Sequence, residues 1–128
     1  METTLIIIDG QNGAGKSTVA RFLHQKLPST ALIHWDTIKK LISDFKPGKE
    51  HHAIAAQVAQ AMTKVYLQNG VSVIYEAYFG RGEYISSLIK KKQRNARVLV
   101  YQVEAPFHLR TQRINFCLAQ CGLLPDRI

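Results

Sequence analysis

The sequence has few of the features that stabilise small secreted proteins or anchor a chain in a membrane. Only two cysteines occur among 128 residues, Cys117 and Cys121, and their spacing places them on one face of a helix. Without nearby histidines they do not complete a zinc site, and they form no disulfide framework. The apolar run at residues 5–8 is far too short to span a bilayer, and the N-terminus lacks the pattern of a secretory signal. We therefore expect a reduced, cytoplasmic protein without a membrane partner.

Acidic residues are also scarce, because 17 lysines and arginines stand against 9 aspartates and glutamates, giving a formal net charge of +8. Much of the excess lies at Lys90, Lys91, Lys92, Arg94 and Arg97. A solvated helix end explains this cluster, since cations favour the negative pole of the helix dipole. A nucleic-acid contact is the alternative, although the aromatic residues typical of single-strand binders are missing here. The charge favours anionic partners, which include nucleotides as well as nucleic acids.

Short apolar runs alternate with longer helical patterns along the whole chain. Strands are predicted around residues 5–8, 31–33, 71–75 and 98–103. Helices are predicted from about residue 15 to Pro28, around 38–42, over 54–65 with a stop at Asn69-Gly70, around 85–89, and after Pro106. This alternation is typical of a parallel sheet covered on both faces, and no linker divides it. Residues 1–128 are therefore expected to form one α/β domain.

The most specific pattern is at residues 10–17, where the sequence GQNGAGKS satisfies G-x-x-x-x-G-K-[ST]. Glycines allow the positive dihedrals that turn successive backbone N–H groups inward, and the following helix adds the positive end of its dipole. Lys16 is expected to reach the β- and γ-phosphates of ATP, and Ser17 to bind Mg²⁺. The residues predicted to hold the nucleotide are Gly10, Gln11, Asn12, Gly13, Ala14, Gly15, Lys16, Ser17 and Thr18.

Two acidic residues follow predicted strands and so lie at the same edge of the sheet as this loop. Asp36 is placed to accept the proton of an attacking hydroxyl, and the same side chain would also cap the helix that begins there. Glu76 closes the third strand, where it would bind Mg²⁺ or orient the substrate. Arg110 and Arg113 are spaced to clamp a transferring phosphate or to face solvent, and Arg81 is a weaker candidate for an anionic acceptor.

Taken together, these motifs resemble those of a known family. The segments GQNGAGKST, HWDTIK, VIYEA and VEAP, with Arg110 and Arg113 behind them, resemble the zeta-toxin and polynucleotide-kinase-like group of P-loop kinases, in the same order over nearly the whole chain. The resemblance implies a three-layer P-loop NTPase fold with about four parallel strands in the order 2-3-1-4. It also implies ATP- and Mg²⁺-dependent transfer of phosphate to a hydroxyl of a small molecule or nucleotide.

The resemblance assigns roles to individual residues. Asp36 matches the base that activates the acceptor hydroxyl, and Arg110 and Arg113 match the arginines of the lid segment. Lys39 stands where the family often has an arginine that binds the acceptor, and lysine cannot make the bidentate contact of arginine. Glu76 stands where the family often has aspartate. Together with the expectations from the residues themselves, these matches give the predicted site. Lys16, Asp36, Arg110 and Arg113 are catalytic, Asp36, Lys39, Glu76 and Arg81 bind the acceptor, and Ser17 and Glu76 bind the metal.

The family usually continues into a fifth strand, whereas this sequence ends at Ile128. We expect that fifth strand to be absent, which makes the chain a fragment or a short member and leaves the fourth strand as an open edge. Two alternatives to the kinase remain open: an NTP-binding module without phosphotransfer, and a 5′-hydroxyl nucleic-acid kinase. The sequence indicates neither the acceptor, nor a preference for ATP over GTP, nor the oligomeric state.

Overall fold

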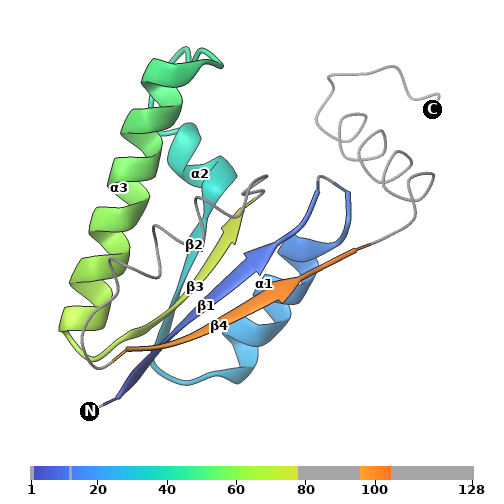
Figure 1. The fold of residues 1–128 in the computed structure, drawn as a ribbon, viewed down its shortest axis with the longest axis vertical. Coiled ribbons are helices and arrows are strands. Elements are labelled where there is room, and N and C mark those ends of the chain that lie inside the picture. Colours follow the sequence, from blue (N-terminus) through green and yellow to red (C-terminus); the bar gives the residue numbers. More distant parts are fainter. Residues whose placement is uncertain (1, 12, 78–95, 105–128) are drawn as a thin grey trace.

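In the described part of the chain, four parallel strands form a central sheet, and helices cover both of its faces (Figure 1). The computed structural model describes residues 2–11, 13–77 and 96–104. The strands are β1 (Thr3–Asp9), β2 (Thr30–His34), β3 (Ser72–Ala77) and β4 (Ala96–Gln102), in the order β2-β3-β1-β4. The α/β class, the parallel sheet and the strand order are therefore as predicted.

Strand β1 is buried on both faces, as a central strand of a parallel sheet should be. Leu5 and Ile7 point into one layer of the core, and Ile6 and Ile8 point into the other. All four side chains are at most 6% exposed. The unbroken apolar run that predicted this strand therefore contributes alternate side chains to two separate core clusters, one on each face of the sheet.

One of these cores lies beneath α1 (Lys16–Lys26), which follows the glycine-rich loop. Ala20 packs there against Ile6, Ile8 and Ile74, with Val19 and Leu23 beside it. The helix ends where predicted, because Pro28 follows and Leu27 leaves the helical conformation. Figure 1 shows α1 on one side of the sheet and α2 and α3 on the opposite side, which gives the three layers.

The opposite face carries α2 (Trp35–Lys39) and α3 (Lys49–Gln68). α2 is shorter than predicted: Ile38 is buried within it, but Leu41 and Ile42 lie past its end and Leu41 is 68% exposed. α3 is confirmed and stops just before Asn69-Gly70. Its buried residues share a four-residue spacing along one face and are Ala55, Ala59, Thr63 and Leu67. The prediction rested on the apolar residues Ile54, Val58, Ala61, Met62 and Val65. Of these, Met62 is partly buried against the core, whereas Ile54, Val58 and Val65 are exposed.

The helices predicted around 85–89 and after Pro106 lie outside the described residues. The same holds for Asn12, Arg81, Arg110 and Arg113. Within the described ranges, no helix is both long and apolar enough to cross a membrane.

Parallel strands end together, so the carboxyl ends of β1, β2 and β3 meet at one edge of the sheet. Asp9 and His34 are the last residues of β1 and β2, and Glu76 is next to last in β3. His34 and Ile8 both align with Glu76 in the strand register. This edge carries the glycine-rich loop and the start of α2, and it is the edge where open α/β folds bind ligands.

Candidate active site

The glycine-rich loop has the backbone conformation that its sequence predicts. Gly13 and Gly15 have φ angles of 82° and 99°, in the region that favours glycine. Gly15 directly precedes α1, so the first N–H groups of that helix face the end of the loop. The first turn of the 11-residue helix α1 contains no acidic residue, so no side chain of the helix itself offsets the positive end of its dipole. This arrangement suits a phosphate group.

Gly10 is required for a different reason than positive φ. A Cβ atom at this position would lie 2.5 Å from the carbonyl oxygen of Val103, just past the end of β4. The backbone N–H of Val103 in turn donates to the carbonyl of Asp9 at 2.8 Å. The loop therefore begins pressed against the backbone of the neighbouring strand, where only glycine fits.

Lys16 and Ser17 occupy the first turn of α1, and both reach the Glu76 carboxylate. The Ser17 hydroxyl donates to Glu76 Oε1 at 3.3 Å, and Lys16 Nζ lies 3.9 Å from the same oxygen. Lys16 is only 9% exposed, so its ammonium group lies in a largely dry environment. The structure thus brings together two loop residues and the acidic residue predicted at the end of the third strand.

Glu76 meets α1 because side chains alternate along β3. Val73, Tyr75 and Ala77 belong to the core beneath α2 and α3, whereas Ile74 belongs to the core beneath α1. Glu76 follows Ile74 by two residues and therefore points toward α1. It is 1% exposed, and burial of a carboxylate without hydrogen-bond partners is unfavourable, so the polar groups around it stabilise this arrangement.

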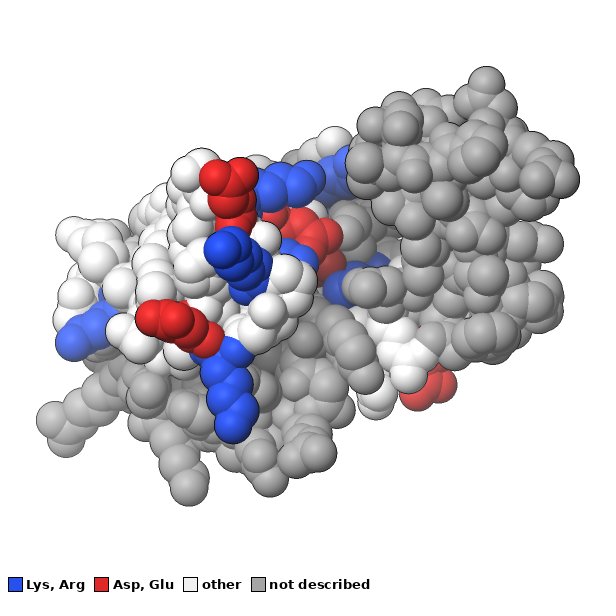
Figure 2. Space-filling model, turned by 90° about the horizontal axis from the view of Figure 1, so that it is seen from above, with Lys and Arg blue, Asp and Glu red and all other residues white. Residues whose placement is uncertain are grey.

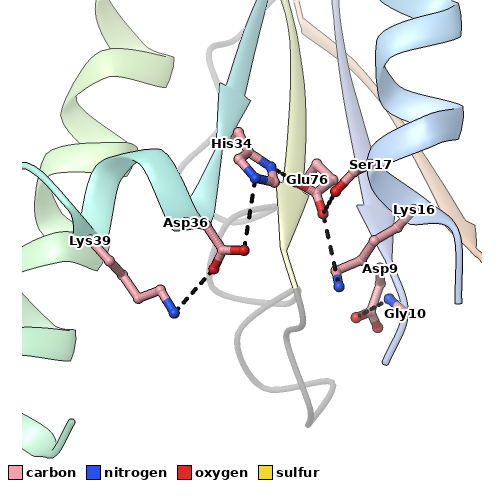
Figure 3. A network of polar contacts seen from close by, with 8 residues as sticks. All are labelled: Asp9, Gly10, Lys16, Ser17, His34, Asp36, Lys39 and Glu76. Atoms are coloured by element: carbon pink, nitrogen blue, oxygen red, sulfur yellow. Dashed lines mark hydrogen bonds and ion pairs between the residues drawn. The ribbon is translucent and has the colours of Figure 1, made fainter. Parts of the chain in front are cut away.

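His34 is a member of the site to which sequence reasoning assigned no role. Its Nδ1 forms a close hydrogen bond with Glu76 Oε2, and its Nε2 lies 3.8 Å from Asp36 Oδ2. Figure 3 shows the imidazole ring between the two carboxylates. The parallel alignment of His34 with Glu76 was the signal that would have identified it, because aligned residues on neighbouring strands share a face of the sheet.

The pKa of His34 is raised above its ordinary value of 6.5, chiefly by the hydrogen bond to Glu76. Partial burial and the charge of Lys16 oppose this shift, and the negative charges of Glu76 and Asp36 support it. A protonated imidazole has a hydrogen-bond donor on each ring nitrogen. The ring is thus suited to its place between two carboxylates.

Asp36 lies in the first turn of α2, one position beyond that helix's first residue, Trp35. His34 occupies the N-cap position and no side chain caps the helix, so the alternative in which Asp36 is the N-cap is wrong. The Asp36 side chain is 56% exposed and forms an ion pair with Lys39, at 3.1 Å between Oδ1 and Nζ. It is therefore held in place on one side and open to solvent on the other.

The pKa of Asp36 is held below its ordinary value of 3.8. Partial burial alone would raise it, but the hydrogen bond and the positive charge of Lys39, with help from His34 and Lys16, outweigh that effect. Asp36 is consequently an ionised carboxylate near neutral pH, able to accept a hydrogen bond from a hydroxyl group.

These contacts form one continuous polar network from the loop to α2 (Figure 3). Within the described part of the chain, no buried side-chain nitrogen or oxygen lacks a hydrogen-bond partner. Among the described residues on the face seen in Figure 2, lysine and arginine side chains lie interspersed with aspartate and glutamate.

The oxygens of Ser17 and Glu76 are of the kind that Mg²⁺ prefers, and they are close to one another. No group of three or more histidine, cysteine, aspartate or glutamate side chains that would hold a metal unaided occurs among the described residues. Mg²⁺ in phosphate-transfer sites is usually held by one or two protein groups together with substrate phosphates and water. The donor set therefore fits Mg²⁺ bound jointly with a nucleotide.

Comparison with known proteins identifies the chain's relatives. The family model described as Zeta toxin matches residues 2–115. No curated protein sequence matches the chain.

Solved structures share the fold. A chain from the Pnkp1/Rnl/Hen1 RNA repair complex superimposes with a TM-score of 0.83 at 18% identity, covering 93% of this chain and 39% of that one. A candidate kinase from Chloroflexus aurantiacus gives 0.76 at 23% identity, covering 98% and 72%. The APS kinase CysC of Mycobacterium tuberculosis, solved with AMPPNP and APS, gives 0.70 at 17% identity, covering 96% and 76%. This chain thus spans 39% of the length of the RNA-repair protein.

Proposed function

The chain belongs to the zeta-toxin family, and we propose that it is a phosphotransferase that moves the γ-phosphoryl group of ATP to a hydroxyl of a small molecule or nucleotide. The observation that carries the proposal is the polar network that connects Lys16 and Ser17 in the phosphate loop to Asp36 at the start of α2. A site that only binds a nucleotide would not require a carboxylate such as Asp36 linked to the phosphate loop.

The loop side of the network would bind ATP. Residues 10–18 would supply backbone N–H groups to the phosphates, with the dipole of α1 behind them. Lys16 would exchange its contact with Glu76 for the β- and γ-phosphates. Ser17 and Glu76 would hold Mg²⁺, which neutralises charge on the phosphates when it is bound.

Asp36 would act as the base. Its carboxylate accepts the proton of the acceptor hydroxyl as that oxygen bonds to the γ-phosphorus, and the bond from phosphorus to the bridging oxygen of ADP breaks. The half-exposed position of Asp36 leaves room for an acceptor to approach. Lys39 would meet an anionic group of the acceptor, and Arg81 is a weaker candidate for the same role. Arg110 and Arg113 would close over the γ-phosphate. The three arginines lie outside the described residues.

A group of aromatic rings borders the Asp36 side of the site, where an acceptor would bind. Lys39 Nζ lies 5.9 Å from the ring centre of Phe45, which in turn lies 5.5 Å from the ring of His51 and 5.3 Å from that of His52. The similarity to an APS kinase solved with a nucleotide and APS supports a nucleotide-like acceptor among the candidates. The aromatic rings are compatible with that acceptor class.

The proposal is tested by incubating the protein with γ-labelled ATP, Mg²⁺ and a panel of nucleosides, oligonucleotides, nucleotide sugars and aminoglycosides. Transfer of label to one class is expected, and Lys16→Ala should lose it because the charge that contacts the phosphates is gone. ATP binding without a labelled product from any acceptor would instead favour the NTP-binding module.

A 5′-hydroxyl nucleic-acid kinase is the second candidate. The net charge of +8 and the similarity to a chain of an RNA repair complex support it. Of the basic cluster at 90–97, only Arg97 lies among the described residues. Oligonucleotide binding that weakens steeply with salt would favour this candidate, because neutralised phosphates release counterions. Equal use of an uncharged acceptor at low and high salt would count against it.

A further inference from the structure

We propose that His34 is a positioning residue, which holds the Glu76 carboxylate toward Ser17 and the Mg²⁺ site and links it to Asp36. The inference rests on the proposed function, because it concerns how the same site handles Mg²⁺ and ATP. Neither the glycine-rich loop nor the pair of acidic residues implies this role.

The two oxygens of Glu76 have different partners. Oε1 faces Ser17 Oγ and Lys16 Nζ, whereas Oε2 is bound by His34 Nδ1. Fixing Oε2 fixes the rotation of the whole carboxylate, and so it determines where Oε1 points. The Glu76 side chain is 2% exposed, so water has little access to replace a lost partner.

His34 is itself held firmly at its backbone. It ends β2, and the parallel pairing of β2 with β3 places it level with Glu76. A side chain mounted on a paired strand is positioned more reproducibly than one on a loop. Because His34 is fixed by the pairing of the strands, its hydrogen bond restricts the orientation of the Glu76 carboxylate.

The other ring nitrogen faces the acceptor side of the site. Nε2 lies 3.8 Å from Asp36 Oδ2, so the ring separates two carboxylates that would otherwise repel each other (Figure 3). His34 therefore joins the half of the site that holds the metal to the half that would hold the base. Outer partners of metal ligands commonly act in this way.

The test compares two substitutions that differ only in which ring nitrogen they imitate. The amide nitrogen of His34→Asn lies near the position of Nδ1, and that of His34→Gln lies near the position of Nε2. ATP affinity is measured by calorimetry with Mg²⁺ and with EDTA, and the ratio of the two dissociation constants gives the enhancement by the metal. His24→Asn on the exposed surface of α1 is the matched control.

We expect His34→Gln to lower the enhancement by Mg²⁺ by about ten-fold, in the range found for outer-shell partners of metals, with little change in EDTA. His34→Asn should retain most of the enhancement, and His24→Asn all of it. A purely structural role would change thermal stability in both His34 variants and leave the ratio unaltered.

Three outcomes would overturn the inference. They are an unchanged enhancement in His34→Gln, an equal loss in both His34 variants, and a wild-type chain that binds ATP equally well with and without Mg²⁺. In each of these, ATP binding by the wild type leaves the proposed function standing. A wild-type chain that does not bind ATP at all contradicts the proposed function itself.

Discussion

At the scale of single residues, Glu76 is a buried carboxylate that lies among polar partners. Its side chain is 2% exposed, and an isolated carboxylate in such a place would be strongly destabilised. Ser17, Lys16 and His34 provide a hydroxyl, an ammonium and an imidazole group around it. Two of these partners belong to the phosphate loop, so ATP binding and the environment of Glu76 are expected to depend on one another.

Lys39 sets the protonation of Asp36, which gives a residue-scale prediction. Replacing Lys39 with Met removes the hydrogen bond and the charge that lower the pKa of Asp36, while the burial that raises it remains. The pKa of Asp36 should rise, and the acid limb of the profile of kcat/KM against pH should move to higher pH. The measurement is the pH dependence of phosphotransfer with the acceptor that the panel identifies.

Lys40→Met is the matched control for this prediction, because Lys40 is exposed and adjacent in sequence. It removes the same charge from the same helix end without touching the ion pair at Asp36. Equal shifts of the acid limb in both variants, or no shift in Lys39→Met, would show that Asp36 does not govern that limb.

At the scale of elements, the loop and α1 depend on backbone conformation more than on side chains. Gly15 has a φ angle of 99° and directly precedes α1. Alanine there should cost about 1–2 kcal/mol of unfolding free energy, because side chains with a Cβ atom disfavour this region. It should also weaken ATP binding, since the N–H groups that face the phosphates would be displaced.

Gly70→Ala separates these two effects. Gly70 has a φ angle of 78° and lies just past the end of α3, away from the phosphate loop in sequence, with open space where a Cβ would be. Chemical denaturation should show a comparable loss of stability in both variants, whereas calorimetry should show weakened ATP binding only in Gly15→Ala. Equal ATP affinities in the two variants would mean that the loop conformation is not what binds the phosphates.

Helix α3 approaches the sheet through small residues, and this gives a second element-scale prediction. Ala59 is fully buried against the core, and Ala61 on the same helix is exposed. Ala59→Leu should lower the free energy of unfolding by about 1–3 kcal/mol, because the added atoms have no space. Ala61→Leu should change it by less than about 0.5 kcal/mol, and denaturant titration measures both. Similar values for the two would contradict the packing described for α3.

At the scale of the whole molecule, the parts of the fold that depend on local pattern were predictable. The loop motif, the apolar strand before it and the alternation of strands and helices led to the parallel sheet, and the resemblance to the P-loop kinases led to the order of its strands. The shared sheet edge also brought Asp36 and Glu76 near the loop in the prediction. Parallel strands end together, so chain order alone is enough for that conclusion.

The features that depend on register and on packing were not predictable from pattern alone. His34 was missed because its role comes from alignment with Glu76, 42 residues away, and not from any local motif. The buried face of α3 was not predicted correctly, because the small residues Ala55 and Ala59 pack against the sheet whereas the larger residues Ile54 and Val58 are exposed to solvent. In both cases the tertiary neighbours decide the outcome.

The central claim is that the loop and Asp36 form one transfer site, and Asp36→Asn tests it most directly. This variant keeps the size and polarity of the side chain and removes its ability to accept the proton. Transfer from γ-labelled ATP to the acceptor and ATP affinity by calorimetry should be measured on the same preparation. The account predicts a loss of transfer by at least about a hundred-fold, with ATP affinity close to that of the wild type. Full transfer by Asp36→Asn would contradict it.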